Sequence, residues 1–338
     1  MPQHNDTSPS AWPHRVAVAL VCATFPLIWV GGLVTTYEAG MAVPDWPSTR
    51  GYNLFLYPWQ TWIGGPWDLF IEHGHRLLGA FSGLLTIVLA VVAWRYDPRR
   101  WLRGLAVGAL AAVIGQGLLG GARVLWNDVL FARIHACTGP LFLVLCVAIA
   151  VCTSKLWWAQ ASPMVHPRAS TLHRLSALSL LLAFLQLVLG AHLRHVPATT
   201  DAQSFRLAVV FHVIMAVVLL LHVAWLALHV AFHHRQQLAL RRPAWMLFAL
   251  ITIQVGLGLA TWVVKYGWPS MLGTPAWAAR MIVEAQGMMP SVIITAHVAT
   301  GSLLLALLML LTLRSQRLVR GPAVAVAAAW LMPGVNAS

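Results

Sequence analysis

The clearest shortage in this sequence is of charge, and of acidic residues in particular. Only 9% of the 338 residues are charged, whereas soluble domains typically contain about 25% charged residues. Asp and Glu together number nine, against 22 Lys and Arg. This composition argues against a soluble globular domain, and it makes each of the few acids a candidate for a specific role.

Cysteine is also scarce, and none lies in the segments between the apolar runs. The four residues all fall inside such runs, at Cys22, Cys137, Cys146 and Cys152. Without a cysteine pair in a loop, the sequence predicts no disulfide framework. Residues 1–14 are polar and lack the apolar core and small-residue cleavage site of a signal peptide.

Apolar residues make up 59% of the chain and are grouped in long runs. Eight runs reach or approach the roughly 20 residues that a helix needs to cross a bilayer. They are residues 16–34, 77–94, 101–122, 131–153, 175–191, 207–231, 245–264 and 291–313. Helix is the expected form because backbone polar groups in lipid must be hydrogen-bonded within the segment. The sequence therefore predicts an all-α polytopic membrane protein with eight transmembrane helices; a ninth run, residues 323–331, is too short to span.

The basic residues are distributed unevenly between alternate loops. The net charge of +13 could suggest a nucleic-acid partner, but its distribution indicates otherwise. With a cytoplasmic N-terminus, the inner loops hold 14 of the 22 basic residues and two of the nine acids. This is the positive-inside pattern. It predicts an integral protein of a bacterial inner or plasma membrane with both termini cytoplasmic, and no nucleic-acid partner.

Two short motifs alternate along the predicted helices. Odd-numbered spans carry Gln-x-x-x-Gly near their outer ends, and the first span has the related Trp-Val-Gly-Gly-Leu. Even-numbered spans carry a histidine with a small residue four positions later, on the same helix face. These pairs are His75/Gly79, His135/Gly139, His212/Ala216 and His297/Gly301. The repeat predicts two pseudo-symmetric four-helix halves, residues 1–160 and 161–320, related as parallel repeats, and a cytoplasmic tail of residues 321–338.

The four motif histidines are predicted to share one depth, about four to six residues into each helix from its outer end. A small neighbour leaves room beside each imidazole for a flat group or a close helix. Two histidines per half predict the pairs His75–His135 and His212–His297, which suit axial ligation of haem iron in a bundle core. For a single histidine the alternative is a hydrogen-bonded packing residue, and zinc is a weaker alternative because four separate helices carry the ligands.

The other histidines match the repeat less well. His73 has no small residue four positions on, so His75 is the preferred ligand on this helix. His192 and His195 close the fifth span and stay ambiguous. His229, His233 and His234 lie at the inner end of the sixth span.

One acid breaks the symmetry of the repeat. Glu72 precedes His75 by three residues and lies on the same helix face. The equivalent positions before the other three histidines are apolar, namely Ala132, Val209 and Ile294. An acid within a membrane span is by default a functional residue. The alternative is a structural carboxylate that caps the helix or pairs with Arg76.

Two further features lie near the predicted outer ends of the helices. Residues 38–70 form a long aromatic segment, which either belongs to an interfacial belt or covers the site. Arginines near the outer ends are candidates for binding haem propionates, because arginine binds carboxylates bidentately; lipid headgroups are the alternative ligand. These are Arg76, Arg123, Arg133, Arg194 and Arg206.

Taken together, these residues resemble the haem A synthases, membrane enzymes that act on haem O. The resemblance covers nearly all eight spans. It rests on Glu72-x-x-His75, Asp45-Trp46-Pro47, the segment from Leu189 to His195, and the three further histidines His135, His212 and His297. Without cysteine pairs in its loops, the chain is similar to the cysteine-free members of that family.

The resemblance implies a role for each half. The first half would hold the substrate haem O between His75 and His135, and the second would hold a haem b cofactor between His212 and His297. Glu72 would be the catalytic carboxylate. The reaction would oxidise the C8 methyl group of haem O to a formyl group by successive hydroxylations, giving haem A for terminal oxidases. The implied partners are a haem O synthase and assembly factors of the terminal oxidase.

Two other functions stay open from the residues alone. A bis-histidine di-haem protein of the quinol-linked cytochrome b type would pass electrons without altering its haem, and the lone acid of the first half argues against it. A haem or small-molecule transporter built from parallel repeats would need access from both faces, whereas the motif residues cluster near one.

Overall fold

The computed structural model describes residues 10–159, 163–197, 199–269, 273, 275–276, 283 and 287–322. The apolar run 323–331, nearly all of the tail 321–338 and most of the polar segment 1–14 lie outside the described residues. Among those described, eight helices are long and apolar enough to cross a membrane. The predicted all-α polytopic membrane fold is therefore confirmed.

The spanning helices are longer than the apolar runs that predict them. They are α1 (Trp12–Thr36), α3 (Trp67–Tyr96), α4 (Arg100–Trp126), α5 (Val129–Thr153), α7 (Ala169–Arg194), α8 (Ala202–His233), α9 (Leu238–Tyr266) and α10 (Met288–Leu318). The largest extension is in α3, which begins at Trp67 rather than near residue 77. A helix continues through the interface because its backbone hydrogen bonds do not depend on lipid, whereas an apolar run ends at the first polar residues.

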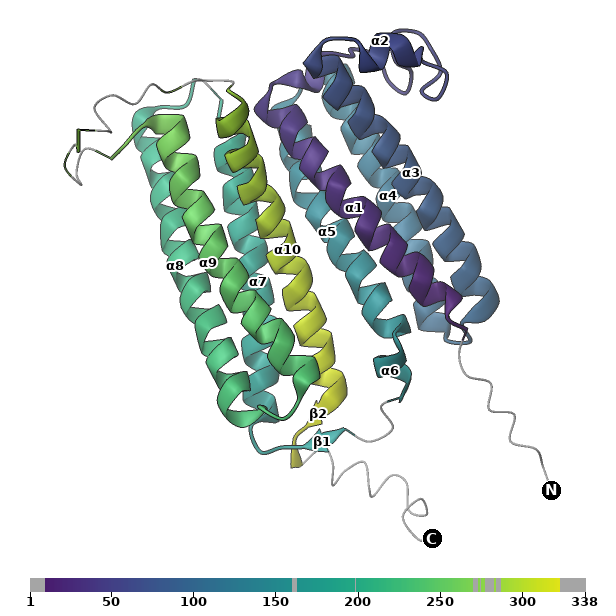
Figure 1. Cartoon of the computed structure of the whole chain (residues 1–338), viewed down its shortest axis with the longest axis vertical. Coiled ribbons are helices and arrows are strands. Elements are labelled where there is room, and N and C mark those ends of the chain that lie inside the picture. Colours follow the sequence, from purple (N-terminus) through teal and green to yellow (C-terminus); the bar gives the residue numbers. More distant parts are fainter. Residues whose placement is uncertain are drawn as a thin grey trace.

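The eight helices form two groups of four (Figure 1). In the first, α1 packs on α3 and α5, and α4 lies between α3 and α5; in the second, α7 and α9 each contact α8 and α10. The groups meet along α1, α5, α7 and α10. At one such contact Gly32 of α1 lies against Thr295 of α10, where an added Cβ would be 2.8 Å from the threonine methyl group.

Short elements lie at the two ends of the bundles (Figure 1). The segment between α1 and α3 contains the 3₁₀ turn η1 (Ala39–Met41) and α2 (Trp59–Ile63). At the opposite end, α6 (Lys155–Ala159) follows α5, and β1 (Met164–Val165) pairs in parallel with β2 (Val319–Arg320). The sequence did not predict this strand pair, which ties the chain before α7 to the end of α10.

Some buried threonine hydroxyls donate to a carbonyl of their own helix. Thr24 donates to the carbonyl of Leu20 at 2.7 Å, and Thr86 donates to that of Ser82 at 2.7 Å. Such i−4 bonds allow threonine to lie on a buried helix face without an unpaired hydroxyl.

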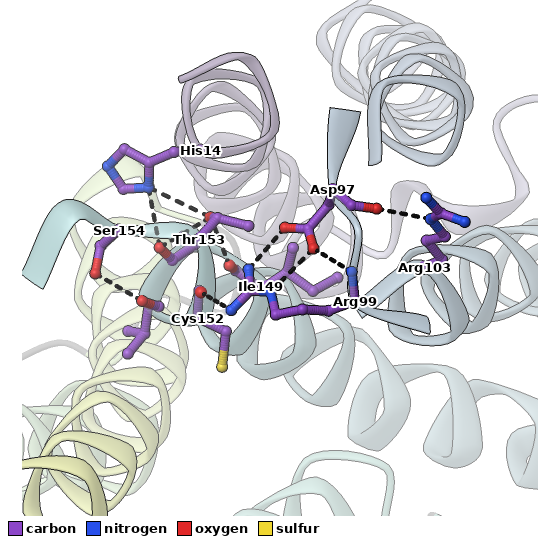
Figure 2. A network of polar contacts seen from close by, with 10 residues as sticks. His14, Asp97, Arg99, Arg103, Ile149, Cys152, Thr153 and Ser154 are labelled. Atoms are coloured by element: carbon purple, nitrogen blue, oxygen red, sulfur yellow. Dashed lines mark hydrogen bonds and ion pairs between the residues drawn. The ribbon is translucent and has the colours of Figure 1, made fainter. Parts of the chain in front are cut away.

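A polar network lies at the end of the first bundle opposite α2 (Figure 2). Asp97 follows α3, is buried, and forms an ion pair with Arg99 at 2.7 Å. Arg99 also donates to the carbonyl of Cys152, and Arg103 donates to the carbonyl of Asp97. His14 of α1 lies 3.0 Å from the carbonyl of Ala150. The network joins α1, α3, α4 and α5, so Asp97 has a structural role at the end opposite the α2 segment.

Candidate functional site

The motif histidines lie in two pairs with the same separation. The rings of His75 on α3 and His135 on α5 have centroids 6.4 Å apart and planes inclined at 85°. The rings of His212 on α8 and His297 on α10 have centroids 6.4 Å apart and planes at 70°. Each pair belongs to one half, and each joins two different helices across the interior of its bundle.

Three of the four histidines lie deeper than the expected four to six residues, and His135 agrees with it. His75, His135, His212 and His297 lie eight, six, ten and nine residues after the first residue of α3, α5, α8 and α10. The expected depth was too small because it was counted from apolar runs, and the helices begin before those runs. Each histidine therefore lies between one and a half and three helical turns from its helix start.

A glycine on the preceding spanning helix faces each histidine ring. A Cβ added at Gly31, Gly120, Gly190 or Gly258 would lie 2.7, 3.3, 3.3 or 3.1 Å from Cε1 of His75, His135, His212 or His297 respectively. Each quarter of the repeat consists of one of these glycine helices and the histidine helix that follows it. In all four quarters the histidine ring therefore rests directly on the backbone of the preceding spanning helix. This explains the glycine of the Gln-x-x-x-Gly motif, whose partner could not be read from sequence.

The glutamines of that motif also contact the site. Gln186 Nε2 lies 3.2 Å from His212 Nε2, and the backbone carbonyl of Gln254 lies 3.2 Å from His297 Nδ1. Gln116 donates to the hydroxyl of Thr138, one helical turn after His135 on α5. The first quarter has Leu27 at this position, so the quarter that lacks the glutamine is also the one that carries Glu72.

The histidine pairs fit a metal group that brings its own equatorial ligands. Metal–imidazole bonds of about 2.0–2.1 Å place two rings that ligate one metal from opposite sides with centroids slightly more than about 6 Å apart, in agreement with the 6.4 Å of both pairs. Buried polar atoms normally have partners, yet Nδ1 of His212 has none among the described residues. No group of three or more His, Cys, Asp or Glu in the described part of the chain could hold a metal ion, so the donor set suits haem rather than zinc.

Glu72 is 2% exposed, and both its oxygens are hydrogen-bonded. Oε1 accepts from Arg76 Nη2 at 2.9 Å, and Oε2 accepts from the backbone N–H of Val43 at 2.9 Å. Glu72 is the sixth residue of α3, which begins at Trp67, so the interpretation as a helix cap is wrong. The alternative pairing with Arg76 is present.

Arg76 anchors residues 37–66, between α1 and α3, to α3; they are called the outer segment after the side predicted for them. It donates to the carbonyls of Val43, Asp45 and Ser48 at 2.7–2.9 Å, in addition to Glu72. Asp45 in turn organises the following turn. Partial burial opposes its ionisation, but hydrogen bonds from Gly51, Ser48 and Arg50 outweigh this and hold the pKa of Asp45 at about 2. The carboxylate therefore keeps its charge throughout the physiological range.

The same segment reaches the first histidine pair. The indole of Trp46 lies against Gly121 of α4, and Gly121 follows the glycine that faces His135. His73 belongs to this contact as well. Its Nδ1 lies 3.1 Å from Thr49 Oγ1, and its ring lies 5.1 Å from that of Tyr57. His73 therefore faces the outer segment, whereas His75 faces His135.

The five candidate arginines occupy different environments. Arg123 donates to the carbonyl of Gly40 at 3.3 Å, and Arg133 donates to that of His195 at 2.7 Å. Arg194 crosses from α7 to α1, where it donates to the carbonyl of Gly32 at 2.6 Å and to Thr36 at 2.7 Å. Arg133 Nε and Arg194 Nη1 are buried without a partner among the described residues. Arg76 has the four partners given above, and Arg206 is exposed.

The two histidines that end the fifth span differ. His192 is exposed, whereas His195 Nδ1 lies 2.9 Å from the carbonyl of Ala191. Burial lowers the pKa of His195, which favours the neutral ring. His195 and Arg123 line a cavity of about 250 Å³ together with Gly40 and Ala132. Its lining comes from the ends of α1, α4 and α5, from the turn η1 and from the residues that follow α7.

Known proteins match this chain over much of its length. A family model described as COX15-CtaA, cytochrome oxidase assembly protein, matches residues 67–274. This range contains Glu72, His75, His135 and His212; His297 lies beyond it.

Curated relatives carry the name Heme A synthase. The protein from Rhodospirillum centenum is 34% identical over 124 residues, which cover 35% of this chain and 31% of the relative. The protein from Shouchella clausii is 29% identical over 201 residues, covering 57% and 62%. That from Listeria welshimeri is 32% identical over 113 residues, covering 33% and 35%. The matched part of the chain thus spans about a third to three-fifths of the length of these relatives. Because the family match covers more than half of the chain, the protein belongs to the COX15-CtaA family of cytochrome oxidase assembly proteins.

Proposed function

We propose that this protein is a haem A synthase, which oxidises the C8 methyl group of haem O to a formyl group by successive hydroxylations. The observation that carries the proposal is the pair of equivalent histidine sites, each with centroids 6.4 Å apart, of which only one has a buried carboxylate on the ligand helix. A protein that only transfers electrons has no need of this difference between its halves.

The proposal assigns one porphyrin to each half. His75 and His135 of the first half, residues 1–160, hold the substrate haem O. His212 and His297 of the second half, residues 161–320, hold a haem b cofactor, which supplies one-electron redox chemistry when bound. Glu72 supports the assignment of the substrate to the first half, since the equivalent positions in the other three quarters are apolar.

The chain's own residues have distinct tasks in this mechanism. Gly31 and Gly120 let the rings of the first pair lie against the helix backbone and so set their orientation. The segment tied down by Arg76 limits the access of water from the outer side. Glu72 holds or releases a proton at its carboxylate, the usual task of a positioned acid. Its bonds to Arg76 and Val43 keep that carboxylate in one place.

Buried arginines are the proposed propionate partners. Arg133 Nε and Arg194 Nη1 are buried and unpartnered among the described residues, and Arg123 uses one terminal nitrogen on Gly40. A carboxylate would satisfy these donors. Arg76 is a weaker candidate because it already has four hydrogen bonds, and Arg206 is weaker because it is exposed.

Identification of the bound pigments tests the proposed function. Pigments extracted from the purified protein should include haem b together with haem O or its hydroxylated or formyl products, identified by mass. Haem b alone at both sites, in cells that make haem O, would favour the di-haem electron-transfer alternative. The physiological partners follow from the reaction: an enzyme that supplies haem O and a terminal oxidase that receives haem A.

The proposed orientation places both termini in the cytoplasm and both histidine pairs near the outer face. Gln203 and Gln236 are exposed at opposite ends of α8. In a variant without the four native cysteines, a cysteine at position 203 should react with an impermeant thiol reagent added outside intact cells. A cysteine at position 236 should react only after the membrane is opened. The reverse pattern would place the histidine pairs on the cytoplasmic side.

A further inference from the structure

Four exposed apolar side chains are grouped on the outer segment, within α2 and just before it. Phe55, Leu56, Trp59 and Ile63 are 70%, 75%, 63% and 58% exposed, and they are called the apolar face of the outer segment. Trp59 and Ile63 are four positions apart and so lie on one side of α2. Residues 51–67 contain no charged residue. Single exposed apolar residues are common on protein surfaces, whereas a group of them marks an interaction site.

Contacts with α3 fix the depth of α2 along the bundle. Trp62 stacks on Phe70 with ring centroids 5.6 Å apart, and its Nε1 donates to the carbonyl of Phe70 at 3.0 Å. A Cβ added at Gly74 would lie 3.6 Å from the same indole. The apolar run of α3 begins at Leu77, so with a rise of about 1.5 Å per residue α2 lies roughly 5–10 Å beyond the start of that run. This depth matches the headgroup region, which extends about 5–8 Å beyond the hydrocarbon core on each side.

The short helix α2 presents a different kind of residue on each side. It turns by about 100° per residue, so Thr61 lies opposite Trp59 and Ile63, and Trp62, which packs on α3, lies between these two sides. Thr61 and Gln60 are polar and exposed. A helix with one apolar and one polar side suits the membrane interface. In Figure 1 the outer segment extends past the end of α3 on the side away from the second bundle.

The apolar surface continues from α2 down the first bundle. Trp62 and Phe70 border an apolar hollow between α1 and α3, which also includes Leu78 and Phe81. Every residue that lines the hollow is apolar or glycine, and Phe81 is exposed. Phe81 belongs to the apolar run of α3, so its surroundings are lipid. The bilayer is therefore the partner that already contacts the surface next to α2.

We propose that the apolar face of the outer segment inserts into the adjacent leaflet of the bilayer and anchors this segment over the first bundle. Apolar burial favours insertion in proportion to the area removed from water, and tryptophan is common at membrane interfaces. Earlier in the segment, Val43 donates to Glu72 and accepts from Arg76. Protein hydrogen bonds thus fix one part of the segment and lipid fixes the other. The inference holds for either orientation of the chain and does not depend on the proposed function.

Spin-label accessibility in lipid nanodiscs tests the insertion. A nitroxide is attached to Leu56→Cys, Ile63→Cys or Thr61→Cys in a variant without the four native cysteines. Oxygen concentrates in the bilayer, whereas a nickel chelate stays in water. The ratio of oxygen to nickel collisions at positions 56 and 63 should exceed the ratio at position 61 severalfold. Position 61 is the matched control, because it lies on the opposite side of the same helix.

The double variant Leu56→Ser, Ile63→Ser tests the anchoring role. Both side chains are exposed, so the variant should fold as the parent protein does. Loss of two apolar side chains from the lipid should raise the hydrogen-exchange rate of the Val43 amide, which donates to Glu72, by about tenfold or more. Gln60→Ser changes the polar side of α2 and should leave this rate unchanged.

Three results would overturn the inference. Dominant nickel collisions at all three labelled positions would place the segment in water. Protection of positions 56 and 63 from both reagents would mean that protein covers the apolar face, such as a second copy of this chain. An unchanged exchange rate of the Val43 amide in the double variant would remove the anchoring role even if the labels reach the lipid. Neither measurement uses a porphyrin, so both stay separate from the test of the proposed function.

Discussion

Replacement of His212 or His297 by Ala should remove the haem b that we propose for the second half. Each variant leaves one imidazole where the structure has two rings with centroids 6.4 Å apart, so the low-spin bis-histidine absorption should disappear. Even the loss of groups that only support a metal ligand lowers affinity by about 10- to 100-fold, and the loss of the ligand itself should do at least as much. The measurement is bound haem b per purified protein.

Two controls make this result specific. His73→Ala removes a histidine that contacts Thr49 and Tyr57, and it should leave haem content nearly unchanged. Gly258→Val keeps both ligands, but its side chain would meet the ring of His297, since even a Cβ would lie 3.1 Å away. It should therefore reduce haem content as well. If both alanine variants retained the full low-spin spectrum, the assignment of the second half would be wrong.

Glu72→Gln should stop formation of haem A while leaving both porphyrins bound. The amide has nearly the same shape but cannot take up a proton, so the ratio of haem A to haem O in membranes, normalised to haem b, should fall by about 10² or more. Glu72→Asp, which keeps the carboxylate, should retain part of the activity. A Glu72→Gln protein with a near wild-type ratio would leave the carboxylate as a structural partner of Arg76.

The structure supplies the control that separates these roles. The side-chain amide of the Glu72→Gln variant can accept only one of the two hydrogen bonds that the carboxylate receives from Arg76 and Val43, so some loosening of the outer segment is expected. Arg76→Gln loosens the same segment more strongly, because it also removes the bonds to the carbonyls of Asp45 and Ser48, yet it keeps the acid. If loosening were the only cause, Arg76→Gln would lose haem A formation at least as completely as Glu72→Gln. A smaller loss in Arg76→Gln assigns the difference to the proton.

Properties that depend on residues near each other in sequence could be predicted without the fold. Eight helices follow from apolar runs of bilayer length, and the spacing His-x-x-x-small repeats in every even span, so His75, His135, His212 and His297 were identified as one set. Helix ends were less predictable. The sequence did not predict the start of α3 at Trp67, because residues 67–76 are mixed in polarity. The apolar run begins only after them, whereas the helix includes them.

The apolar runs and the spacing of motif residues thus determined the class of fold, the number of spans and the candidate residues. Both patterns depend only on residues within a few helical turns of each other. Only the tertiary structure decided which groups meet. It set Gly31 against His75, 44 residues apart in the numbering, brought the N–H of Val43 to Glu72, and carried Arg194 across to Gly32 of the other half. These contacts join elements that are distant in sequence, and a sequence pattern specifies the face of a helix but not the neighbour that this face contacts. The partners of Glu72 could therefore come only from the packing of the outer segment on α3.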